Sequence, residues 1–220
     1  GHTKTPVDLV AREKFSQSGT ATSLMTIAGE ALDLPDATSS ARSTAFAGGY
    51  PRTFASAFFS SFSGTSRSLF TYSNSGSVNN RNRLGLGVYT TAGKLACLTY
   101  GLTGSSNAAS ESSQAFSTTR MNVGVGIIRS SSDRQVVLNG IAASVSTTTV
   151  SPAGIDTLNI GEGAGSSVHS NMPAQHLMEC LWEAELSVED AKDFSLNPFQ
   201  ILEVVPSRLF FGLPSAGTTY

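Results

Sequence analysis

Short apolar segments recur along most of this chain, and residues that favour turns separate them at intervals of about eight to twelve residues. Several segments alternate, as in Leu84, Leu86 and Val88, and a period of two is typical of strands with one buried face. Such spacing predicts an all-β sandwich or barrel. The expected strands are residues 23–36, 53–62, 66–73, 83–91, 94–102, 120–130, 135–140, 141–149, 155–163 and 175–186.

Two stretches rich in Ser, Ala and Gly, residues 37–52 and 104–114, are expected to be loops. In residues 53–62, Phe54, Phe58 and Phe62 repeat at a spacing that also suits a helix. Ser and Ala fill the gaps between these rings and Phe favours strands, so we expect a strand here.

Local signals mark one hairpin and one helix. Asn139-Gly140 predicts a two-residue hairpin turn, because both residues accept positive φ. Ser187 with Asp190 three positions later forms a capping box, which predicts a short helix that ends at Asn197-Pro198.

Charge and composition exclude several classes of function. Only 14% of the residues are charged and the net charge is −2, which gives no basis for binding nucleic acid or an acidic membrane. No apolar run reaches the length of a membrane span, and the first residues lack the apolar stretch of a signal peptide. Cys97 and Cys180 lie in apolar segments and are expected to be buried thiols, although a disulfide between them stays open.

The order of motifs in the second half of the chain resembles the concanavalin A-like, laminin-G-like domain. The motifs are residues 121–128, Asp133-Arg134, 136–140, 158–161, and Trp182 followed by Leu186, Ser187 and Asp190. The resemblance covers roughly residues 20–196. It implies a two-sheet antiparallel jelly-roll sandwich with a short helix near the C-terminus, in which Trp182 packs between the sheets.

The end of the chain is similar to sandwich domains of tailed-bacteriophage virion proteins. The residues concerned are Asn197 to Gln200, Pro206 and 209–211. This resemblance implies a non-enzymatic structural protein at the capsid surface of a virion, namely a head decoration or cement protein that binds the major capsid protein and sister copies of itself. The alternative is a carbohydrate-binding module of a tail fibre or spike.

Both termini are expected to reach beyond the sandwich and to contact partners. Residues 1–19 read as an N-terminal arm and residues 197–220 as a C-terminal tail that packs on the domain or on a neighbour. Apolar side chains that neighbours could cover are the natural contacts of such segments. The partner-binding residues predicted for these two segments are Val7, Leu9, Val10, Arg12, Leu209, Phe210 and Phe211.

An enzyme of this fold would hydrolyse glycosides with a pair of acids. Glu179, Glu183 and Glu185 are the nearest candidates, but Leu181 stands where the resemblance implies a catalytic Asp. We therefore expect no catalysis, and we read these acids as exposed strand and turn charges. The three histidines have no metal-ligand spacing and the Asp and Asn residues are scattered, so no cofactor, zinc or calcium is expected.

Sugar binding would draw on aromatic rings. Tyr72, Tyr89, Tyr100 and Trp182 could stack on pyranose rings, but Trp182 is expected in the core. Tyr50, beside a Gly-Gly turn, is the freer candidate. The structural residues singled out by the sequence are Trp182, Asn139 and Gly140.

Overall fold

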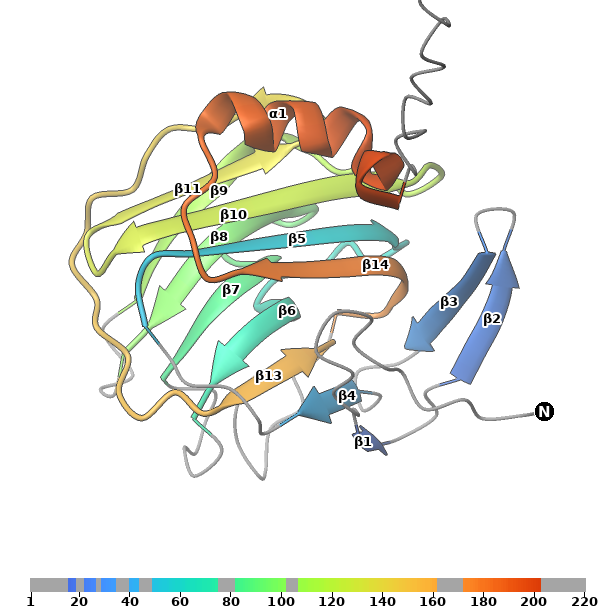
Figure 1. The fold of residues 1–220 in the computed structure, drawn as a ribbon, viewed down its shortest axis with the longest axis horizontal. Coiled ribbons are helices and arrows are strands. Elements are labelled where there is room, and N and C mark those ends of the chain that lie inside the picture. The colour runs from blue at the N-terminus through green and yellow to red at the C-terminus, as the bar shows by residue number, and fades with distance from the viewer. Residues whose placement is uncertain are drawn as a thin grey trace, which may run out of the picture.

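A computed structural model describes residues 49–74, 82–101, 107–161 and 172–200 in full, together with the backbone of four earlier strands and of residues 201–202. Within these residues the strands form two seven-stranded antiparallel sheets that face each other (Figure 1). The chain is therefore an all-β jelly-roll sandwich with a short helix near its C-terminus, as the sequence predicted.

The sheet next to the helix is called the helix-side sheet. In spatial order its strands are β12 (Ile141–Ala142), β11 (Asp133–Leu138), β10 (Asn122–Ser130), β5 (Arg52–Phe59), β14 (Ala174–Trp182), β3 (Gly29–Leu34) and β2 (Thr22–Thr26).

The second sheet is called the far sheet. In spatial order its strands are β1 (Ser16–Ser18), β4 (Ser40–Ser43), β13 (Thr157–Ile160), β6 (Arg67–Ser73), β7 (Arg83–Val88), β8 (Lys94–Tyr100) and β9 (Asn107–Ala115).

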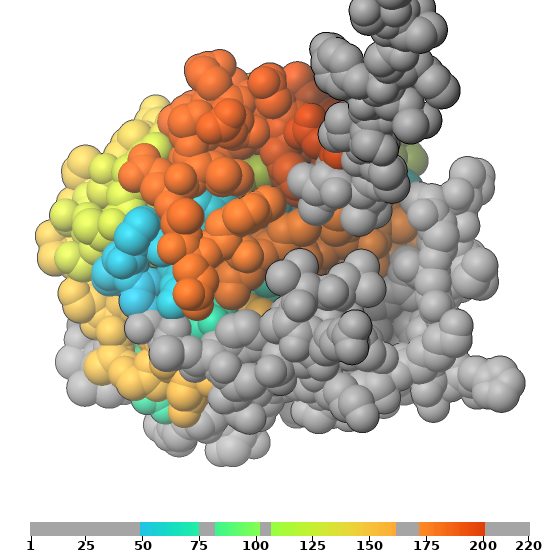
Figure 2. Space-filling view, viewed as in Figure 1, coloured from blue at the N-terminus to red at the C-terminus, as the bar shows by residue number. Residues whose placement is uncertain are grey.

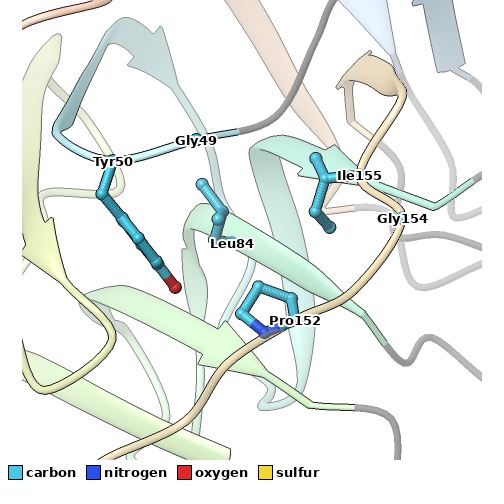
Figure 3. Close-up of a pocket in the computed structure, with 6 residues that line it drawn as sticks. All are labelled: Gly49, Tyr50, Leu84, Pro152, Gly154 and Ile155. Atoms are coloured by element: carbon cyan, nitrogen blue, oxygen red, sulfur yellow. The ribbon is translucent and has the colours of Figure 1, made fainter.

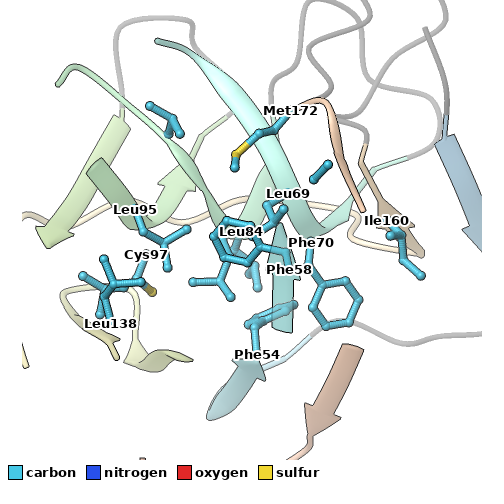
Figure 4. Packing of buried hydrophobic residues seen from close by; sticks show 14 of the residues in the cluster. Phe54, Phe58, Leu69, Phe70, Leu84, Leu95, Cys97, Leu138, Ile160 and Met172 are labelled. Carbon is cyan, nitrogen blue, oxygen red and sulfur yellow. The ribbon is translucent and has the colours of Figure 1, made fainter. Parts of the chain in front are cut away.

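Side chains from the inner faces of the two sheets form the main core (Figure 4). In β5, Phe54 and Phe58 point into this core, as a strand with a period of two requires. The Phe54 ring meets Phe70 of the far sheet edge-on, with 5.6 Å between ring centroids. The sheets approach closely at Gly124 of β10, because a Cβ atom there would stand 2.1 Å from a methyl group of Leu95.

A second apolar cluster lies on the outer face of the helix-side sheet, beneath helix α1 (Val188–Leu196). Figure 2 shows α1 as a ridge across this side of the molecule, next to β14. The Ser187 hydroxyl accepts a hydrogen bond from the Asp190 backbone N–H at 3.1 Å, so the predicted N-cap forms. The helix ends at Asn197, and Pro198–Leu202 continues as a 3-10 helix.

The position of Trp182 corrects the sequence analysis. Its ring belongs to the cluster beneath α1, where it packs edge-to-face on Phe194 with 5.2 Å between ring centroids. The expectation that Trp182 packs between the two sheets is therefore wrong. Its neighbour Leu181 points inward instead, because successive residues of a strand alternate between the two faces.

The Asn139-Gly140 turn forms as expected between β11 and β12. Both residues have positive φ, +49° and +81°. The Asn139 side chain also ties the turn to β10, because its Oδ1 accepts a hydrogen bond from the Val123 N–H at 2.8 Å. Gly140 donates its own N–H to the Ser195 hydroxyl of α1 at 2.7 Å, which links the turn to the helix.

Two stretches expected to be loops contain strands. Residues 104–114 include most of β9, which pairs with β8, and residues 37–52 include β4, which pairs with β1 and β13. Strand β1 lies within residues 1–19, the range assigned to an arm, so the sheet extends into that range. The predicted partner-binding residues of both termini lie outside the described residues.

The two cysteines differ in their surroundings. Cys97 is fully buried in the main core, and burial raises the pKa of its thiol to about 12. Cys180 is half-buried beneath the helix. The two cysteines form no disulfide with each other.

Candidate functional site

A pocket of about 260 Å³ opens at the end of the sandwich from which β5, β7 and β13 start. Its described lining comes from three separate parts of the chain, the turn before β5, the start of β7 and the connection that leads into β13. The lining residues are Gly49, Tyr50, Leu84, Pro152, Gly154 and Ile155.

Tyr50 forms one side of this pocket. Figure 3 shows its ring across from Pro152 and Ile155, with Leu84 between the two sides. The residue is 37% exposed, which makes it one of the few large apolar side chains open to solvent among the described residues. Burial of the rest of the ring raises the pKa of the phenol, and the charge of Arg134 opposes this. The hydroxyl therefore stays protonated at neutral pH and can donate a hydrogen bond.

Buried arginines hold the backbone on each side of the pocket. Arg52 donates from Nε to the carbonyl oxygen of Gly49 at 3.2 Å. On the other side, Arg134 is 0% exposed and donates to the carbonyl oxygens of Thr148 at 2.9 Å and Ser131 at 2.5 Å. These contacts hold the connection that leads to Pro152.

The chemistry of this pocket suits an uncharged or amphipathic ring. None of its six described lining residues carries a charge, and the polar groups that they offer are backbone atoms and the Tyr50 hydroxyl. A pocket with an apolar floor and a few directed polar groups is a usual form of small-molecule site. The described lining contains no carboxyl side chain.

The three candidate acids have different environments. Glu183 is 72% exposed and pairs with Arg52 at 2.6 Å, whereas Glu185 pairs with Arg129 at 2.6 Å. Strand β14 ends at Trp182, so these two acids lie beyond the regular strand. Leu181, which stands between the acids, packs against the main core.

Glu179 lies on the inner face of β14, paired in register with Ser56 of β5. Its Oε1 accepts a hydrogen bond from the Ser56 hydroxyl at 2.6 Å and lies 2.5 Å from Nδ1 of His176. Burial is the largest influence on this carboxyl and raises its pKa, against the opposing effect of these two partners. The reading of Glu179 as an exposed charge is therefore wrong.

Solved structures resemble the fold, although no protein-family model and no curated protein matches the sequence. The CBM40 domain of the Ruminococcus gnavus IT-sialidase, bound to α2,3-sialyllactose, matches with a TM-score of 0.55 and 14% identity over 66% of this chain and 82% of that chain. Domain 4 of AbnA, a GH43 extracellular arabinanase from Geobacillus stearothermophilus, in complex with arabinotriose, matches with a TM-score of 0.59 and 13% identity over 81% of this chain and 82% of that one.

The NanB sialidase from Streptococcus pneumoniae is also similar, with a TM-score of 0.53 and 18% identity over 66% of this chain. The matched part is 24% of that longer enzyme. At these identities the likeness establishes a shared β-sandwich fold.

The other tyrosines named by the sequence lie outside this pocket. Tyr72 is 1% exposed and packs on Phe54 in the main core. Tyr89 and Tyr100 pack edge-to-face at 5.9 Å, and the Tyr89 hydroxyl donates to Asn107 at 2.6 Å. Tyr50 is thus the aromatic candidate that reaches the pocket.

Two further expectations concern metals and membranes. Among the described residues, no group of three His, Cys, Asp or Glu side chains could hold a metal ion. No helix in the described part of the chain is long and apolar enough to cross a membrane.

Proposed function

We propose that this chain is a non-catalytic carbohydrate-binding module in which a sugar ring packs against Tyr50. The observation that carries the proposal is the half-open tyrosine ring on one side of a pocket whose described lining is uncharged. Sugar rings present C–H groups on one face and hydroxyls at the edge. The face can pack on Tyr50, while the edge can meet the phenol and the backbone of the opposite side.

The arrangement of the acids supports binding over hydrolysis. Most retaining and inverting glycosidases use two carboxyl groups that flank the scissile bond. Here Glu183 and Glu185 are held by separate arginines, and Glu179 is enclosed in the sandwich. The ordinary role of such contacts is structural.

Two of the matched structures contain a bound oligosaccharide, sialyllactose in one and arabinotriose in the other. This favours the carbohydrate-binding alternative of the sequence analysis over its main reading, the capsid decoration protein. None of the three structures described above is a virion protein, so the expectation of a capsid partner draws no support from them.

The test is a glycan array probed with the full chain, followed by calorimetric titration of each hit. Tyr50→Ala should weaken binding roughly five- to tenfold, because aromatic packing is worth about 1–1.4 kcal/mol. Tyr50→Phe, which keeps the ring, should bind within a few fold of the wild type.

Leu196→Ala is the matched control, since Leu196 is an exposed apolar side chain on α1, at 69% exposure, outside the pocket lining. It should bind like the wild type. A wild-type chain that binds no glycan, or one that Tyr50→Ala leaves unaffected, would contradict the proposal. Release of sugar from any bound oligosaccharide would show that the module is catalytic.

A further inference from the structure

The side of the pocket opposite Tyr50 is held by two asparagines from a distant part of the chain. The N–H of Ala153 donates to Oδ1 of Asn82 at 3.1 Å, and the carbonyl oxygen of Ala153 accepts from Nδ2 of Asn74 at 3.1 Å. Both polar atoms of this residue's backbone are therefore bound by side-chain amides. Ala153 lies between two lining residues, Pro152 and Gly154.

The two asparagines occupy matching places in the far sheet. Asn74 follows the last residue of β6, and Asn82 precedes the first residue of β7. Their backbones are joined, because the Asn74 N–H donates to the carbonyl oxygen of Asn82 at 3.0 Å. Asn82 is 2% exposed and has φ of +51°, a conformation that Asn adopts more readily than most residues.

Gly154 lets the pocket backbone pass close to Asn74. Its φ is +62°, and a Cβ atom there would stand 2.4 Å from Nδ2 of Asn74. Any larger residue would displace either the amide or the backbone that lines the pocket. The positive φ of this position favours glycine, and a larger residue there would also disturb the Asn74 contact.

We propose that Asn74 and Asn82 are positioning residues that fix the Pro152–Ile155 side of the pocket for its ligand, an inference that rests on the proposed function. The connection from β12 to β13 contains no strand between residues 143 and 156, so its backbone needs other partners to keep one conformation. With both polar atoms of Ala153 bound, the pocket is formed before the sugar arrives. Binding then does not bear the entropic cost of ordering this segment.

Asn82 offers a clean pair of variants. Asn82→Gly removes the amide and accepts the positive φ, whereas Asn82→Asp keeps an acceptor oxygen and tolerates the same backbone conformation. Asn107→Ala is the matched control, because Asn107 accepts a hydrogen bond from Tyr89 and does not line this pocket. Each variant is titrated with the strongest array hit well below its melting temperature, and hydrogen exchange at the Ala153 amide is measured without ligand.

Asn82→Gly should lower the affinity roughly three- to tenfold, the range expected for one lost hydrogen bond, and should speed exchange at Ala153. Asn82→Asp and Asn107→Ala should bind the same glycan with an affinity within about twofold of that of the wild type. A merely structural role would lower the melting temperature of Asn82→Gly and leave its affinity unchanged.

The two proposals fail in different ways. If Tyr50→Ala weakens binding and Asn82→Gly does not, the positioning role is overturned and the proposed function stands. If the wild type binds no glycan, the proposed function fails and the positioning role fails with it. Slow exchange at Ala153 in Asn82→Gly would also overturn the positioning role, whatever the ligand.

Discussion

The two faces of the helix-side sheet carry apolar layers of different character. Between the sheets, β5 contributes Phe54 and Phe58, both 0% exposed, to a core that extends across the sandwich. On the opposite face, beneath α1, the same strand contributes Ala55 and Ala57. Large residues inside and small ones outside let the sheets interlock on one side and the helix lie close to the sheet on the other.

This difference shows why the only tryptophan of the chain is not at its centre. Trp182 is half-buried in the cluster that also contains Ala55 and Ala57, where it packs on Phe194 of the helix. Helix α1 thus packs on a small apolar cluster of its own. The contact between α1 and the helix-side sheet can therefore be weakened without opening the main core. The sandwich and the helical layer should therefore respond differently to substitution.

The largest effect is expected for Phe58→Ala in the main core. Phe58 is 0% exposed and packs edge-to-face on Phe116 at 5.7 Å between ring centroids. Removing a fully buried ring should lower the free energy of unfolding by about 3–5 kcal/mol. Urea denaturation followed by circular dichroism measures this change. A loss below about 1 kcal/mol would contradict the close packing of Phe58 in the main core.

A smaller effect is expected for Trp182→Ala in the helical layer. Because this ring is half-buried, the loss should be about half that of a fully buried one, about 2 kcal/mol. Helix α1 should loosen first, so amide exchange in residues 188–196 should speed up more than in β5. If Trp182→Ala lowers the free energy of unfolding as much as Phe58→Ala does, the two layers form one cooperative core. The main core and the helical layer then do not differ in their response to substitution.

Much of the fold could be predicted because local chemistry and wider packing agree. Strands such as β7 alternate Leu and Gly with a period of two, and the Asn139-Gly140 turn and the Ser187 cap are short-range signals. Strand β9 was missed because its Ala and Ser residues have weak strand preference. Its buried hydroxyls are instead bound within the fold, as when Ser110 donates to the Ser144 carbonyl at 2.7 Å.

The sequence could not predict on which face of β14 Trp182 lies. It also could not predict the pocket. Both faces of β14 meet apolar layers, so alternation alone does not say which layer receives the ring, and the register shifts between His176 and Met178. The pocket joins Tyr50 to Leu84 and to residues more than a hundred positions away, a proximity that arises from topology. Only Tyr50 had a recognisable signal, an aromatic ring next to a Gly-Gly turn.

The smallest effect is expected for Gly140→Ala, at the turn that meets the end of α1. Gly140 has φ of +81°, and an added Cβ atom would stand 2.8 Å from a methyl group of Leu196. The backbone conformation should cost about 1 kcal/mol in unfolding free energy. The close contact should add little, since Leu196 is 69% exposed and can turn away.

The double variant Gly140→Ala with Leu196→Ala separates these two contributions. If the backbone conformation dominates, removing the Leu196 side chain recovers almost none of the unfolding free energy lost in Gly140→Ala. The melting temperatures of the single and double variants then differ only by the small effect of Leu196→Ala itself. Full recovery in the double variant would mean that Leu196 is held firmly against the turn. The helical layer would then be as rigid at its C-terminal end as the core between the sheets, and the contrast between the two layers would hold only around Trp182.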